Sequence, residues 1–197
     1  WEGSAQELRA VPIAWRTESE PPERLPTLAE ALALCKGRCK VVVELKSYGH
    51  NVSLEEKVVA LVEEAGMVDD CIFMWLDHDM VHKLKQLRPS WRSGVLVAKA
   101  MGDLSRFNAD FYAVEAKLAT RRFVRRAHAE NREVYVWTVN DPAWMLSAMS
   151  RGVDGLITDR PDVARAVVAK RAAMSDGERL LMALLVRVGA RPENLRG

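Results

Sequence analysis

The sequence predicts an α/β protein built around a parallel sheet. Short segments rich in β-branched residues alternate six times with segments of helical periodicity, and alternation at this pitch requires crossover connections between parallel strands. Six such units fit an open doubly wound sheet, which the pattern slightly favours, or an eight-stranded β/α barrel that lacks two strands. No glycine-rich phosphate loop follows any predicted strand, so the dinucleotide-binding form of the open sheet has no support.

Six segments are predicted to be strands because they are short, apolar and bounded by turn residues. They cover residues 40–46, 71–76, 94–98, 111–116, 133–139 and 155–158. The first of them, KVVVELK, contains three consecutive β-branched residues, so we expect it to be buried on both faces. A short helical turn is expected near residues 103–107.

Capping residues place the helices between these strands. We expect a turn after Ser4, capping boxes at 27–30 and 53–56, an N-cap with proline at 141–142, and glycine stops at 37, 66 and 152. Helices are also predicted over 77–87 and 120–130 and from Pro161 onward, with an interruption at 175–177. The rest of residues 1–26 is expected to be irregular, because prolines interrupt it.

The composition excludes several classes of protein. Of the 197 residues, 49% are hydrophobic and 28% are charged, and the net charge is +2, which argues against a disordered chain and against a nucleic-acid partner. The longest apolar run, Leu180 to Val186, is far shorter than the ~20 residues that span a bilayer, and no signal segment is evident. Cys35, Cys39 and Cys71 are expected to be reduced thiols.

The end of the first strand is the strongest candidate for a functional site. Period-two alternation places Glu44 and Lys46 about 7 Å apart on one face, opposite Val43 and Leu45. A carboxylate and an ammonium in this arrangement suit a divalent metal beside an anionic phosphate. The alternative is a buried Glu–Lys ion pair, or one side chain facing solvent, and spacing alone slightly favours that alternative.

Other strand ends offer further candidates. Trp137 could cover a substrate or belong to the core. Glu115 could enter the site or pair with Lys117, and His50 lies in the loop after Lys46. Asp159 is expected to brace a loop rather than to bind a ligand. His78, His82 and His128 are expected on solvated helix faces, as are Arg121, Arg122, Arg125 and Arg126.

Four phrases in this order resemble the glycerophosphodiester phosphodiesterase family. They are LPTLAE (25–30), VELK (43–46), VWTVN (136–140) and GVDGLITDRP (152–161), and the likeness covers residues 25 to about 168. The segments ELKSYGHN (44–51) and DFYAV (110–114) look closest to a bacterial subgroup whose members often carry an N-terminal membrane domain.

The resemblance implies a TIM-type (β/α)8 barrel and metal-dependent hydrolysis of glycerophosphodiesters to an alcohol and glycerol 3-phosphate. It implies that Glu44 binds a divalent ion, calcium or magnesium. Lys46 then acts as a catalytic and substrate-binding residue at the phosphate, and Trp137 lines the substrate site. Glu115 and His50 are weaker candidates for substrate contact.

The sequence also departs from the family pattern. The His-Arg, Glu-x-Asp and His-Asp phrases of the family's first two strands are not found. We therefore expect an incomplete barrel over residues 1–174, with six of eight strands, and a helical extension over 175–197. This chain alone would be inactive, would self-associate through its open edge, and would be cytoplasmic or attached to a membrane through the missing part. The alternatives are a degenerate, non-catalytic barrel used for binding or assembly, and an unrelated sugar-phosphate enzyme.

Overall fold

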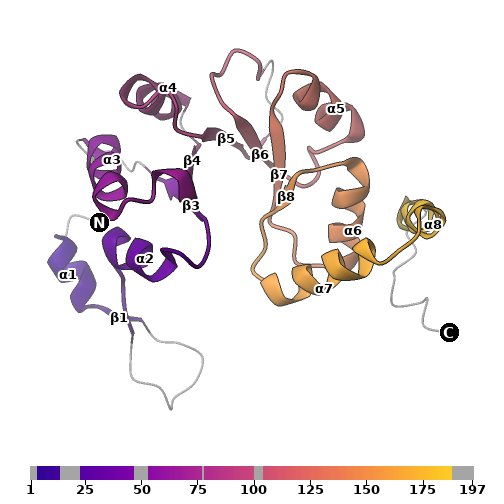
Figure 1. The fold of residues 1–197 in the computed structure, drawn as a ribbon, viewed down its shortest axis with the longest axis horizontal. Coiled ribbons are helices and arrows are strands. Elements are labelled where there is room, and N and C mark those ends of the chain that lie inside the picture. Colours follow the sequence, from indigo (N-terminus) through magenta and orange to yellow (C-terminus); the bar gives the residue numbers. More distant parts are fainter. Residues whose placement is uncertain (1–3, 14–22, 47–52, 77, 100–103, 188–197) are drawn as a thin grey trace. The chain divides into compact units, whose positions relative to one another are not determined.

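The structure is a computed structural model that describes residues 4–13, 23–46, 53–76, 78–99 and 104–187 (Figure 1). The chain forms two compact units. Unit 1 contains residues 1–42 and 51–71, and unit 2 contains residues 43–50 and 72–197. Each unit is described by itself.

Unit 1 consists of short helices and a two-stranded ladder. Its elements are α1 (Ala5–Ala10), β1 (Pro12–Ile13), β2 (Glu23–Arg24), α2 (Leu28–Cys35), α3 (Leu54–Ala65) and η1 (Val68–Asp70). The turn expected after Ser4 is present, whereas the prediction that the rest of residues 1–26 is irregular is wrong where β1 and β2 form. A capping box between Ser4 and Glu7 starts a full helix, and β1 pairs antiparallel with β2. Proline fits β1 because it is the strand's first residue.

The two predicted capping boxes of unit 1 have different outcomes. The box between Thr27 and Glu30 is present: the Glu30 N–H donates to Thr27 Oγ1, and the Thr27 N–H donates to the Glu30 carboxylate. The box at Ser53 is absent, because Ser53 has the left-handed conformation (φ 62°) and its side chain makes no cap. The predicted stop at Gly66 (φ 63°) is confirmed.

Unit 2 contains the sheet and most of the helices. Its strands are β3 (Val41–Leu45, whose first two residues belong to unit 1), β4 (Cys71–Trp75, whose first residue belongs to unit 1), β5 (Ser93–Val97), β6 (Phe111–Glu115), β7 (Glu133–Trp137) and β8 (Gly155–Leu156). Its helices are α4 (His78–Leu87), α5 (Arg121–Ala129), α6 (Pro142–Arg151), α7 (Pro161–Ala172) and α8 (Asp176–Arg187). Every predicted strand and helix of this unit is present, with bounds shifted by a few residues.

The strand order decides between the two predicted architectures. The strands lie in the sheet in the order in which they occur in the chain, β3 to β8, and every registered pair from β4 to β8 is parallel. A doubly wound sheet reverses its order at a switch point, whereas a β/α barrel does not. The described strands therefore have the topology of a barrel, and the slight preference for an open sheet was wrong.

One face of the sheet holds a tightly packed apolar cluster. Met74, Leu96, Phe111 and Ala113 are buried there, and Tyr135 and Trp137 are among the partly buried side chains that pack against them.

Gly94 lies beneath Phe111, so closely that a Cβ at this position would stand 2.2 Å from the ring.

β3 departs from its prediction of two-sided burial. Val42 is 48% exposed while Val43 and Leu45 are buried, because β3 ends the described sheet and presents alternate side chains to solvent.

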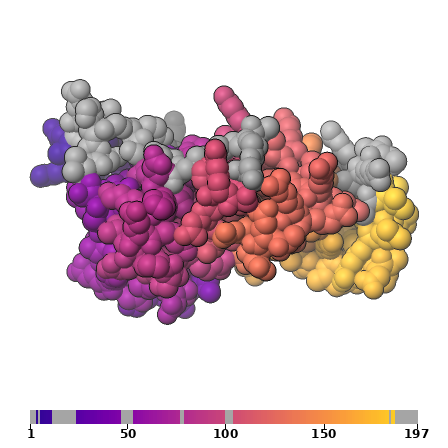
Figure 2. All heavy atoms as spheres, turned by 90° about the horizontal axis from the view of Figure 1, so that it is seen from above, coloured from indigo at the N-terminus to yellow at the C-terminus, as the bar shows by residue number. Residues whose placement is uncertain are grey.

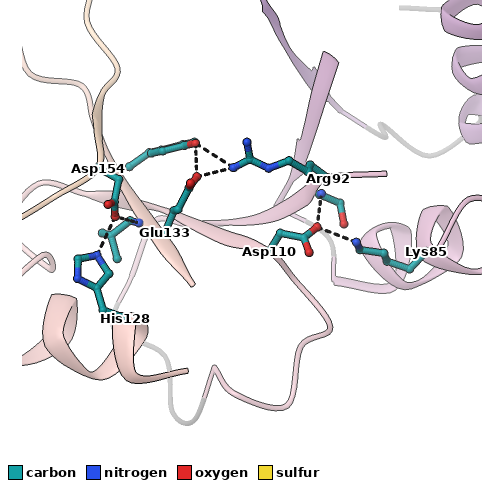
Figure 3. A network of polar contacts seen from close by, with 9 residues as sticks. Lys85, Arg92, Asp110, His128, Glu133 and Asp154 are labelled. Atoms are coloured by element: carbon teal, nitrogen blue, oxygen red, sulfur yellow. Dashed lines mark hydrogen bonds and ion pairs between the residues drawn. The ribbon is translucent and has the colours of Figure 1, made fainter. Parts of the chain in front are cut away.

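Two aspartates anchor the amino-terminal ends of the strands (Figure 3). Asp110, just before β6, accepts a bond of 2.7 Å from Lys85 of α4 and one from the backbone at the start of β5. Asp154, just before β8, accepts bonds of 2.8 Å from His128 of α5 and from the N–H of Val134 in β7. Each carboxylate thus joins a helix to the strand that follows it. His128 is exposed, as predicted, and also serves this structural pairing.

The last helix presents apolar side chains at the surface. Leu180, Leu181 and Leu184 of α8 are each more than half exposed, and Figure 2 shows this helix in yellow. Among the described residues, no helix has both the length and the apolar character needed to cross a membrane. The boundary predicted at residue 174 and the predicted self-association stay predictions.

Candidate active site at the carboxyl ends of the strands

Glu44 and Lys46 project to the same side at the end of β3. Lys46 Nζ lies 3.4 Å from Glu44 Oε1, and the two side chains are 52% and 31% exposed, respectively. Val43 and Leu45 point the other way into the core. The predicted common face is therefore observed. The two side chains also form an ion pair, but the pair is partly exposed rather than buried. A partly exposed pair of this kind is held weakly, so both groups could exchange partners when an anion or a cation arrives.

A pocket of about 360 Å³ lies beyond the ends of β6 and β7. It is lined by residues 115–117, 137–141 and Trp144. Glu115 and Trp137 are register partners on the two adjacent strands, so their side chains leave the sheet on the same face. A volume of this size falls in the range of small-molecule sites.

Trp137 belongs both to the core and to the pocket. Its Nε1 donates a 3.0 Å hydrogen bond to the carbonyl of Ala113 on β6, and its ring packs against the buried apolar cluster. Its remaining surface lines the pocket. The interpretation of Trp137 as a core residue is therefore confirmed, its contact with a substrate stays a prediction, and the hydrogen bond fixes the orientation of the indole.

The rim of the pocket is braced by a hydrogen-bond network around Asn140, one of the lining residues. The Asn140 amide donates to Asp159 Oδ2 at 2.8 Å, and its carbonyl oxygen accepts from the Thr158 hydroxyl and the Asp159 N–H, both at 2.9 Å. The prediction that Asp159 braces a loop is confirmed. The network ties the segment after β7 to the segment after β8 and so holds the pocket rim in place.

Sequence reasoning missed Trp144. Asp141 caps α6 by accepting from the N–H groups of Ala143 and Trp144 at 2.9 and 3.0 Å. The cap places the Trp144 indole, 48% exposed, at the pocket. The signal was present in the sequence: the first turn of a helix that follows a barrel strand lies at the carboxyl end of the sheet, where barrel enzymes keep their sites.

The candidate residues fall into separate groups. Glu115 and Trp137 share the pocket, whereas Glu44 and Lys46 are not part of its lining. Glu115 also pairs with Lys117 at 3.7 Å, so both of its predicted roles are compatible with the structure. His50 lies outside the described residues. In the part of the chain that is described, no three His, Cys, Asp or Glu side chains gather as a metal site would require.

Comparison with known proteins gives one consistent result. The sequence model of the glycerophosphoryl diester phosphodiesterase family matches residues 1–163. Glycerophosphodiester phosphodiesterase GDPD4 of Arabidopsis thaliana is 29% identical over 150 residues. YhdW of Bacillus subtilis (strain 168), which carries a provisional name of the same enzyme class, is 25% identical over 156 residues. These matches cover 71% and 76% of this chain but only 45% and 64% of the relatives' own lengths.

Solved structures show the same fold. A glycerophosphodiester phosphodiesterase from Parabacteroides distasonis ATCC 8503 has a TM-score of 0.74 and 21% identity, with 86% of this chain and 72% of that chain covered. An Oleispira antarctica phosphodiesterase in complex with the product sn-glycerol-3-phosphate has a TM-score of 0.63 and 20% identity, with 74% and 62% covered. The strand order and these likenesses agree with the match to the family model, which places the chain in the glycerophosphoryl diester phosphodiesterase family.

Proposed function

We propose that the protein that carries this domain hydrolyses glycerophosphodiesters to an alcohol and glycerol 3-phosphate. Membership of the family is the observation that carries the proposal. The structure of the Oleispira relative with glycerol 3-phosphate supports a phosphate-containing ligand. The charged pair at the end of β3 supports the proposal from the side of this chain.

Lys46 is proposed to bind the phosphate. Its side chain is 52% exposed and its ammonium lies 3.4 Å from Glu44, in an exposed pairing that a phosphodiester could replace at little cost. An ammonium at this position would offset the negative charge that builds on the phosphoryl oxygens as the bond to the alcohol breaks. Removal of one preorganised donor of this kind lowers the rate by roughly 100- to 1,000-fold.

Glu44 is proposed to contribute one ligand to a divalent ion, calcium or magnesium, which would supply further charge neutralisation when bound. Hard cations take six or more oxygen ligands, and the described residues offer no cluster of three candidate ligands. The described residues therefore do not complete a metal site. Metal dependence is tested by removing the metal ion with a chelator, which we expect to abolish activity. Addition of magnesium or calcium should then restore the activity.

Trp137 and Glu115 are proposed to contact the substrate from the pocket after β6 and β7. Trp137 offers a rigid apolar surface because Ala113 holds its indole, and Glu115 offers a carboxylate beside it. His50 stays a candidate from the sequence alone.

The proposal is tested by release of glycerol 3-phosphate from glycerophosphocholine by the intact protein. We expect Lys46→Met to lower kcat/KM by about 100-fold or more. Lys57→Met is the matched control, since Lys57 lies exposed on α3, and it should retain activity. An intact protein that releases no glycerol 3-phosphate from any glycerophosphodiester would refute the proposal in favour of a non-catalytic barrel, an alternative that the family membership does not favour.

A further inference from the structure

We propose that the pocket after β6 and β7 is a subsite for a positively charged alcohol, with Trp144, Trp137 and Glu115 as its specificity-determining residues. This inference rests on the proposed function, because the alcohol is the leaving group of the proposed substrate. It names the class of that alcohol as a quaternary ammonium such as choline.

The composition of the pocket wall is the first argument. Two indoles, Trp137 and Trp144, line one pocket of about 360 Å³ together with the carboxylate of Glu115. Electron-rich ring faces attract a cation that carries methyl groups, and tryptophan is the most effective ring for this purpose. A carboxylate adds a full negative charge to the same site. A polyol could stack on an indole and donate to the carboxylate, but only a cation gains from the negative ring faces and the full negative charge together.

The exposure of Trp144 is the second argument. Its side chain is 48% exposed at the first turn of α6, although a large aromatic side chain normally gains stability by burial. Asp141 fixes the backbone of this turn by capping it, so the residue that carries the indole is placed at the pocket wall. An exposed, positioned indole at a pocket wall suits contact with a ligand better than a role in packing.

The loosely paired carboxylate in the pocket is the third argument. Asn140 is committed to the brace with Asp159, and Asp141 is committed to the helix cap. Glu115 is engaged only loosely, because Lys117 Nζ lies 3.7 Å from its carboxylate, beyond hydrogen-bond range, and the Lys117 side chain is 77% exposed. A cationic ligand can therefore displace Lys117 and take its place beside Glu115.

The direct test compares the binding of choline with that of 3,3-dimethylbutan-1-ol, which has the same shape but no charge. Binding is followed by ligand-observed NMR of the methyl protons with the full chain. We expect choline to bind roughly tenfold more tightly or better. Trp144→Ala and Glu115→Gln should each remove most of this difference, Trp144→Phe should keep part of it, and Lys117→Met should increase it, since the competing ammonium is gone.

The control is Glu130→Gln, which removes a partly exposed, ion-paired carboxylate at the end of α5, outside the pocket. It should leave the preference for choline unchanged. Equal binding of the two ligands by the unaltered chain would overturn the inference, as would a preference that persists in Trp144→Ala after circular dichroism shows the variant to be folded. Choline binding by a protein without hydrolytic activity would refute the proposed function but leave the cationic subsite standing.

Discussion

Replacement of Gly94 by alanine tests the packing of the sheet face on which the pocket is built. The added Cβ would lie 2.2, 2.4 and 2.5 Å from three atoms of the Phe111 ring, whereas ordinary contacts begin near 3.4 Å. The ring would have to move by roughly 1 Å. It is fully buried and contacts the ring of Tyr135 at a centroid distance of 4.9 Å, so the strain cannot be relieved into solvent.

Overpacking of this kind costs about 1–3 kcal/mol of the free energy of unfolding. With a urea dependence of about 2 kcal/mol per molar, the unfolding midpoint should fall by roughly 0.5–1.5 M. The assay is urea unfolding followed by tryptophan fluorescence and far-ultraviolet circular dichroism. Gly177→Ala is the matched control, because nothing lies within 4 Å of the added Cβ in α8, and it should keep or slightly raise the midpoint. A Gly94→Ala protein as stable as the unaltered chain would refute the register of β5 on β6.

Three further predictions concern stability. Asp154→Ala leaves the buried N–H of Val134 without its acceptor and should cost about 1–3 kcal/mol in thermal unfolding; an unchanged melting temperature would contradict the anchoring role. The cap from Thr27 lowers the pKa of Glu30 from 4.5 to about 2, so its stabilisation is present above pH 4.5 and lost as the pH falls toward 2; Glu30→Gln should flatten this part of the pH dependence of unfolding, and an unaltered profile would refute it. Trp137→Phe loses the hydrogen bond to Ala113 and should lower the free energy of unfolding by about 0.5–1.5 kcal/mol in urea.

The elements of unit 2 could be predicted because their signals are local. Helix α6 begins after the cap residue Asp141, with Pro142 in its first turn, and ends at Gly152. The backbone preferences that set both ends act within a few residues. The cap of Ser53 failed for the opposite reason. The residue types of a capping box are present, but Ser53 has a left-handed backbone conformation, which the spacing of the residue types does not determine.

The order of the strands is a long-range property that alternation alone does not determine. Both candidate architectures use the same right-handed crossovers, so the choice between them depended on the resemblance to a family. Burial of β3 was overestimated for a similar reason, since three valines suit a central strand as well as an edge strand, and only the sheet order shows Val42 on an open side.

The candidate site was predicted in part. Strand alternation was enough to place Glu44 and Lys46 on one face, and it could not show that they pair with each other. Trp144 was overlooked because its role depends on where the first turn of α6 lies relative to Trp137, a distance across the fold. Lys85 lies on the same helix as His78 and His82, which were expected on a solvated face, yet the Lys85 side chain is only 10% exposed because it reaches Asp110.

The most direct test of the account is the activity of Glu44→Gln in the intact protein, measured as metal-dependent release of glycerol 3-phosphate from glycerophosphocholine. The substitution keeps the size of the side chain and removes the charge that faces Lys46 at the end of β3. We predict a fall in kcat/KM of about 100-fold or more, with an unchanged circular dichroism spectrum and with full activity in Glu130→Gln. Activity within threefold of the unaltered protein would contradict the placement of the reaction at this end of the sheet.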